Sequence, residues 1–68
     1  MKIKNVTWVD KNVLIEVDNI PFTWKCGGTV MIDNQEYNAN IVFDLPNNIA
    51  VYDVEIEDLI NKEIKFII

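Results

Sequence analysis

Apolar and polar residues alternate from residue 22 to residue 43, and this period of two predicts a β-hairpin. A two-residue turn at Asn34-Gln35 would sort the apolar residues onto one face. The opposite pairs would then be Ile32 with Tyr37, Val30 with Ala39, Gly28 with Ile41 and Cys26 with Phe43. A slip of one residue would reverse the sorting, so the pattern predicts the register as well. The same turn sets Asp33 against Glu36, which makes a four-residue loop the alternative.

Gly27-Gly28 interrupts this alternation where the backbone would bend or form a bulge. The pair lacks the further glycines and the strand-to-helix context of a phosphate-binding loop. We therefore interpret it as a structural corner of the kind found in small barrels.

The N-terminal residues predict a second hairpin, with strands over 3–9 and 13–17. Asp10-Lys11-Asn12 would close it, with Asn12 in the left-handed conformation that a three-residue loop favours.

Pairing Val9 with Val13 in this hairpin sets Trp8 opposite Leu14 on its outer face. A tryptophan beside a leucine on an exposed face can contribute to an interface. The alternatives are that the two faces are reversed here, or that the C-terminal segment covers this face.

Turn signals divide the rest of the chain into short elements. Ile20-Pro21 separates the two hairpins, because a residue before proline is held in an extended conformation. Residues 45–48 predict a turn with proline and asparagine in favourable positions. The alternation over 49–56 then predicts another strand.

The last residues predict one helical turn followed by a strand. The spacing of Ile56, Leu59 and Ile60 is helical, which favours a single turn over 57–62. A final strand over 63–68 closes the chain. Its inward side chains would be Ile64, Phe66 and Ile68.

Together these elements predict one all-β domain over residues 1–68, since a chain of this length has room for a single core. We expect a small antiparallel barrel or sandwich of five to six strands, with one short helical turn before the last strand. This order of elements is similar to an SH3-like barrel in architecture only.

Composition argues against an enzyme, because the chain contains no serine, histidine or arginine and only one cysteine. A reactive cysteine needs a base or a cation beside it, and the pattern places Cys26 on the apolar face, away from Lys25. We therefore expect a buried inert thiol, no catalytic residues, no cofactor and no metal site.

The acidic residues offer the best candidate for a binding site in a chain of net charge −5. Four carboxylates fall within six residues: Asp53, Glu55, Glu57 and Asp58. Carboxylates two residues apart on a strand form a regular negative strip, which could receive a basic partner. The alternatives are a solvated face that keeps the domain soluble and, less favoured, a metal or acid–base site. A calcium-loop spacing is missing.

Nucleic-acid binding is disfavoured, because six lysines and no arginine on an acidic chain supply little positive charge. The pattern places Phe22, Trp24 and Tyr37 on the core face. Only Trp8 and Tyr52 remain as stacking residues for a nucleic acid or a carbohydrate.

The sequence therefore predicts a small acidic protein-interaction domain, such as an inhibitor or adaptor that occupies a basic surface of a partner protein. The partner-binding residues would be Asp53, Glu55, Glu57, Asp58, Trp8 and Leu14. The abundance of Asn, Ile and Lys suits an AT-rich genome, including those of many phages. A self-associating structural subunit, forming a homo-oligomer, is the first alternative. No secretory signal or membrane span is apparent, so we expect a cytoplasmic protein.

Overall fold

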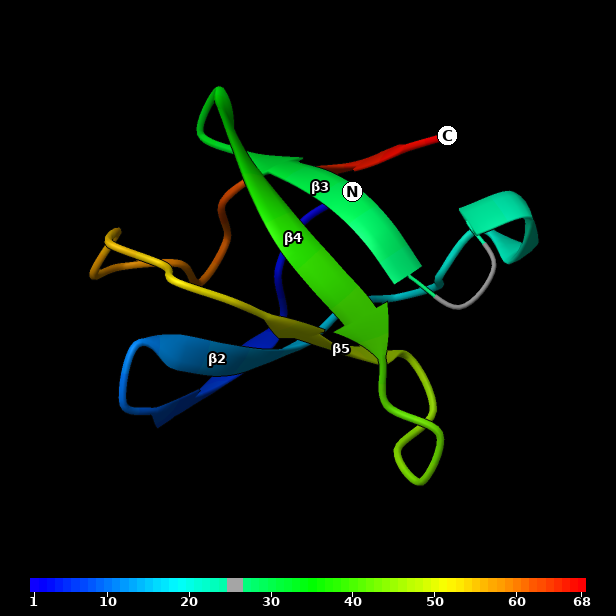
Figure 1. Cartoon of the computed structure of the whole chain (residues 1–68), viewed down its shortest axis with the longest axis horizontal. Helices are drawn as coiled ribbons and strands as arrows, with labels where there is room; N and C mark the ends of the chain where they lie inside the picture. Colours follow the sequence, from blue (N-terminus) through cyan, green and yellow to red (C-terminus); the bar gives the residue numbers. More distant parts are fainter. Residues whose placement is uncertain (25–26) are drawn as a thin grey trace.

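Six short strands and one 3₁₀ turn make up the computed structural model, which describes residues 1–24 and 27–68 (Figure 1). The elements are β1 (Asn5–Val9), β2 (Asn12–Glu16), η1 (Phe22–Trp24), β3 (Gly27–Ile32), β4 (Gln35–Ile41), β5 (Asn48–Val51) and β6 (Ile64–Ile67). The all-β prediction is confirmed.

The strands form one antiparallel sheet in the order β1-β2-β5-β4-β3-β6, in which the end of β4 lies against β5 (Figure 1). The sheet stays open, because no ladder joins β1 to β6 within the described residues. Of the two predicted forms, a barrel or a sandwich, the closed barrel is therefore not formed by the described residues. The residues before β1 do reach the start of β6. The Ile64 N–H donates to the Met1 carbonyl at 2.9 Å, and the backbones of Lys2 and Glu63 form an isolated antiparallel β-bridge.

One face of the curled sheet carries the core, because period-two alternation places alternate residues of each strand on that face. Ile15, Val30 and Ile49 from three strands are fully buried there. Trp24 packs edge-on against Phe66 with ring centroids 4.9 Å apart, and its indole N–H donates to the Thr29 carbonyl at 3.1 Å.

The β3–β4 hairpin forms as predicted, with its turn one residue earlier than expected. Asp33 and Asn34 both have positive φ, 54° and 66°, as a type I′ turn requires. Aspartate and asparagine tolerate this conformation better than other residues with a side chain. Val30 therefore pairs with Tyr37 instead of Ala39, a shift of two residues that keeps the predicted faces.

The β1–β2 hairpin has a register one residue away from the prediction. Asp10, with φ of 61°, takes the left-handed position, so the loop has two residues and Val9 pairs with Asn12. Trp8 therefore faces Val13 on the core side of the sheet, whereas Leu14 faces Thr7 on the other side. The expected Trp8–Leu14 pair is wrong, because an odd shift moves Trp8 to the opposite face.

The helical turn expected over 57–62 is absent. Leu59 is buried and anchors a β-turn, in which the Lys62 N–H donates to the Leu59 carbonyl at 3.1 Å and Asn61 has φ of 70°. The 3₁₀ turn lies instead at η1, before β3. In the last strand Ile64 is buried and Phe66 packs against the core as predicted, but Ile68 is exposed.

The region around Gly27-Gly28 differs from the long strand expected from residue 22. The two glycines begin β3, with Gly27 where the backbone closely approaches β4 and Gly28 beside the Trp24 indole. Phe22 and Phe43, expected on the core face, are 93% and 83% exposed. The predictions for Lys25 and Cys26, including a buried thiol, fall outside the described residues.

Candidate functional site

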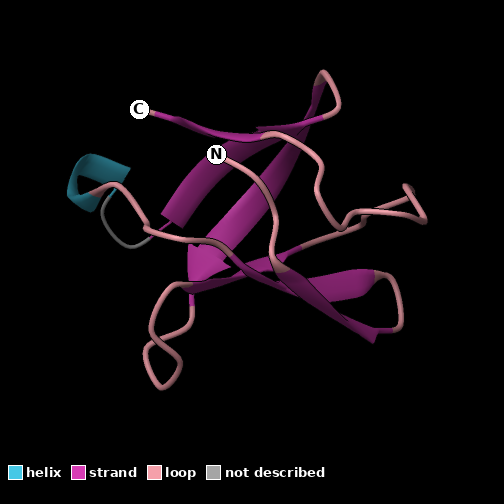
Figure 2. Ribbon diagram, turned by 180° about the vertical axis from the view of Figure 1, so that it is seen from behind, coloured by secondary structure: helices cyan, strands magenta, loops and turns pink. Residues whose placement is uncertain are grey.

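The acidic segment, residues 53–58, lies in the connection between β5 and β6 instead of on a strand. The predicted strand over 49–56 ends at Val51. Beyond it the Asp53 N–H donates to Asn12 Oδ1 at 3.2 Å, and the Val54 N–H donates to the Lys11 carbonyl at 2.9 Å. These bonds hold the connection beside the β1–β2 hairpin (Figure 2).

Apolar side chains fix the acidic segment to the core while its carboxylates face solvent. Val54 is only 4% exposed, and Ile56 packs against the core cluster. The four acidic side chains are all exposed: Asp53, Glu55, Glu57 and Asp58. Burial of the apolar residues thus presents the charges on the outside of a well-anchored loop.

A shallow hollow of about 280 Å³ brings Trp8 together with part of the acidic segment. Its lining consists of Trp8, Val54, Glu55, Ile56 and Glu57. The indole is 41% exposed, because this face of β1 is only partly covered by the connection between β5 and β6. Trp8 and two of the predicted carboxylates therefore share one surface, which we call the Trp8 hollow.

The remaining predicted residues lie elsewhere. Leu14 is half-buried on the opposite face of the sheet, beside Thr7 and Ala50. Asp53 sits next to the β1–β2 turn, and Asp58 lines a second hollow. Leu14 is thus separated from the surface that Trp8 and the acidic segment share.

The acidic segment makes no ion pair in the described part of the chain. The three ion pairs there join the Met1 amino group to Glu63 at 3.0 Å, Lys4 to Asp18 at 3.5 Å and Lys62 to Asp33 at 3.9 Å. No described amino group therefore lies within 4.0 Å of the segment's carboxylate oxygens.

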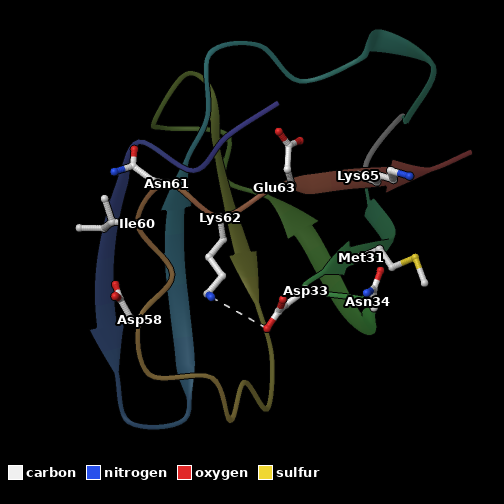
Figure 3. Close-up of a pocket in the computed structure, with 9 residues that line it drawn as sticks. All are labelled: Met31, Asp33, Asn34, Asp58, Ile60, Asn61, Lys62, Glu63 and Lys65. Carbon is white, nitrogen blue, oxygen red and sulfur yellow. Dashed lines mark ion pairs between the residues drawn. The ribbon is translucent and has the colours of Figure 1, made fainter.

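The second hollow, of about 480 Å³, lies between the β3–β4 turn and the turn before β6 (Figure 3). Its wall holds both signs of charge, including the Lys62–Asp33 ion pair. A hydrogen bond from the Met1 amino group lowers the pKa of Glu63, helped by that group's charge and by Lys2 and Lys65. Such mixed, internally paired charge is weakly suited to selecting a charged partner.

Tyr37 is a buried polar side chain near the acidic segment. Burial is the main cause that raises its pKa above the ordinary value, and the charges of Glu55 and Asp33 add to the effect. Its hydroxyl donates to Gln35 Oε1 at 2.9 Å. The sequence pattern placed this residue in the core, but it gave no sign that Glu55 lies close enough to affect it.

The proposed stacking residues do not form one platform. The Tyr52 hydroxyl accepts a hydrogen bond from Asn40 Nδ2 at 2.9 Å. Asn40 belongs to the face of the sheet that Leu14 and Ala50 share, opposite to the Trp8 face. A nucleic-acid or carbohydrate ligand would therefore meet only one of the two rings.

Phe22 and Phe43 are two exposed aromatic residues that the sequence pattern placed in the core. Both lie at the end of the sheet where β3 begins and β4 ends. The sequence did contain a sign that the strands end before these residues. Ile20-Pro21 precedes Phe22 and the turn residues 45–48 follow Phe43, and such residues interrupt strands.

Among the described residues, no group of three or more acidic, cysteine or histidine side chains is placed to hold a metal ion. No helix in the same residues is long and apolar enough to cross a membrane. Comparison of the chain with known protein families, with curated proteins and with solved structures finds no match.

Proposed function

We propose that this chain is a small acidic, non-enzymatic protein-interaction domain that binds a basic surface of a partner, as an inhibitor or adaptor. The observation that carries the proposal is the acidic segment 53–58. Its carboxylates are exposed, lack ion pairs in the described residues and lie partly beside the exposed ring of Trp8.

Charge and apolar contact would act together at this surface. A concentrated negative patch steers a basic partner into encounter, and rim charges contribute mainly to association rate and selectivity. A partly buried tryptophan beside the patch supplies the apolar contact that affinity requires, since tryptophan is enriched among the residues that dominate interface energetics. A purely solvated acidic face would not need such a ring.

The SH3-like resemblance belongs to this proposal as well. Binding residues lie disproportionately on loops that a rigid scaffold positions, and the acidic segment is such a connection between strands. The contacts of residues 1–3 with 61–64 support an arrangement similar to a barrel opened at one seam.

Quantitative affinity capture from the native host tests the proposal with three baits. The first is the wild type, and the second carries D53N, E55Q, E57Q and D58N. The third carries D18N, E36Q, D44N and E63Q, which removes the same number of exposed aspartates and glutamates outside the segment. The proposal expects a specific partner with a basic surface on the first and third baits and its loss from the second. Equal recovery on all three baits would reject a role for the segment.

Self-association is the second candidate, favoured by the open edge strands β1 and β6 and by the exposure of Phe22 and Phe43. Unpaired strand edges are templates for pairing with another chain. Light scattering at high protein concentration tests it, since a monomeric mass would exclude a self-associating subunit.

A further inference from the structure

We propose that the Trp8 hollow binds an arginine side chain of the partner, with its guanidinium against the indole and between Glu55 and Glu57. This inference rests on the proposed function and specifies the chemistry that the acidic surface recognises. It also separates the part of the acidic segment that touches the ligand from the part that acts through long-range charge.

The lining of the hollow has an apolar part and a charged part, as an arginine side chain does. Trp8 and Ile56 supply apolar surface, and Glu55 and Glu57 supply charge beside it. An arginine side chain has an apolar stem and a charged head, and it lowers its free energy by burying the first while pairing the second. The charge complementarity favours a cation over a neutral apolar side chain.

The position of Trp8 favours arginine over lysine. Its ring is partly exposed on the wall of the hollow, so a cation can approach it. A cation over an indole is attracted by the ring quadrupole, and this contact is seen more often with arginine. The planar guanidinium also stacks on aromatic rings and forms paired hydrogen bonds with carboxylates, which a lysine ammonium cannot do in the same geometry.

The described part of the chain supplies no cation to the Trp8 hollow. No lysine in the described residues forms an ion pair with either carboxylate, and the chain contains no arginine of its own. Among the described residues the two carboxylates are therefore left available to a cation from another molecule.

Nuclear magnetic resonance of the ¹⁵N-labelled protein tests this with acetylated tetrapeptides of arginine, lysine or citrulline. The indole N–H of Trp8 is the reporter. Trp24 is the internal reference, because it is 3% exposed and its N–H is bonded to the Thr29 carbonyl. We expect a saturable shift of the Trp8 signal with the arginine peptide. Binding should be about threefold weaker with the lysine peptide and absent with the uncharged citrulline peptide.

Two matched variants locate the contact. E55Q/E57Q should weaken binding of the arginine peptide about fivefold, whereas E36Q/D44N, with the same change in net charge, should leave it within about twofold. W8L, which lacks the indole reporter and is followed by the backbone N–H signals of residues 55–57, should abolish the preference for arginine over lysine. An unchanged Trp24 signal shows that each variant is folded.

A Trp8 signal that stays fixed, that moves equally with citrulline or that depends as strongly on E36Q/D44N would overturn the arginine site. If the arginine peptide binds the other carboxylates without moving Trp8, this inference fails while the acidic interaction surface stands. Loss of the proposed function would appear separately, as equal capture by the three baits.

Discussion

At the residue scale, Tyr37 links the core to the acidic segment. Its ring is buried, its hydroxyl is bonded to Gln35, and the nearby Glu55 disfavours a second negative charge. The folded state therefore holds the phenol proton more tightly than the unfolded state, in which the tyrosine pKa is about 10.

This difference predicts how stability depends on alkaline pH. The contribution from Tyr37 is fully present below about pH 10 and is lost as pH rises through the raised pKa, because the folded state binds more protons there. Urea denaturation across this range measures the effect. Tyr37→Phe should flatten the alkaline decline, while Tyr52→Phe, which removes the other tyrosine hydroxyl, should leave it in place. An identical decline in both variants would contradict the assignment to Tyr37.

Single residues also explain where the sequence was a poor guide. Alternation alone placed Phe22 and Phe43 in the core, yet both side chains are exposed. Alternation has meaning only while the strand continues, and both residues lie beyond the strand ends. By contrast Val30, Ile32 and Ala39 lie inside strands and are buried as predicted.

At the element scale, turn chemistry decides the register of each hairpin. The sequence predicted both hairpins and the buried face of β3–β4, because period-two alternation survives a shift of two residues. It missed the turn positions, since Asp10 and Asp33 occupy left-handed conformations that several neighbouring residues could also have taken. In β1–β2 the predicted register was one residue off, so the prediction put Trp8 on the outer face although it lies on the core side.

The close approach of β3 to β4 gives a prediction for the two adjacent glycines. A Cβ added at Gly27 would lie 2.8 Å from the Ala39 carbonyl oxygen, whereas one at Gly28 would meet its nearest atom, Trp24 Nε1, at 3.5 Å. The two φ angles are nearly equal, 158° and 157°, so Gly28→Ala controls for backbone strain. Gly27→Ala should lower the free energy of unfolding by about 1–3 kcal/mol more than Gly28→Ala. Urea denaturation checks the difference, and equal losses would rule out the steric explanation.

At the scale of the whole molecule, local patterns predicted the strands and the all-β class, but they did not predict whether the sheet closes into a barrel. Alternation indicated an antiparallel all-β domain, which the six-stranded sheet confirms. Closure depends on how much the sheet curls and on where β1 and β6 end, and no local pattern encodes either. The helical spacing over 57–62 was misleading, because Leu59 and Ile56 reach the core from an irregular connection.

The sequence identified the residues of the candidate site, but it did not show which of them lie together. Trp8 and the acidic segment stand out in the sequence by ring size and charge density. Their meeting in one hollow depends on the β1–β2 register and on backbone hydrogen bonds from Asp53 and Val54 to the β1–β2 turn. Those bonds join parts of the chain more than forty residues apart, which no local pattern reveals.

The salt dependence of partner binding tests the central claim, that the acidic segment 53–58 receives positive charge from a partner. The dissociation constant of the captured partner is measured from about 0.1 M to about 1 M salt, which shortens the Debye length from about 10 Å to about 3 Å. We predict that wild-type affinity falls steeply with salt. The variant carrying D53N, E55Q, E57Q and D58N should bind more weakly and with a much flatter dependence. The same affinity and the same salt dependence in both proteins would contradict the account.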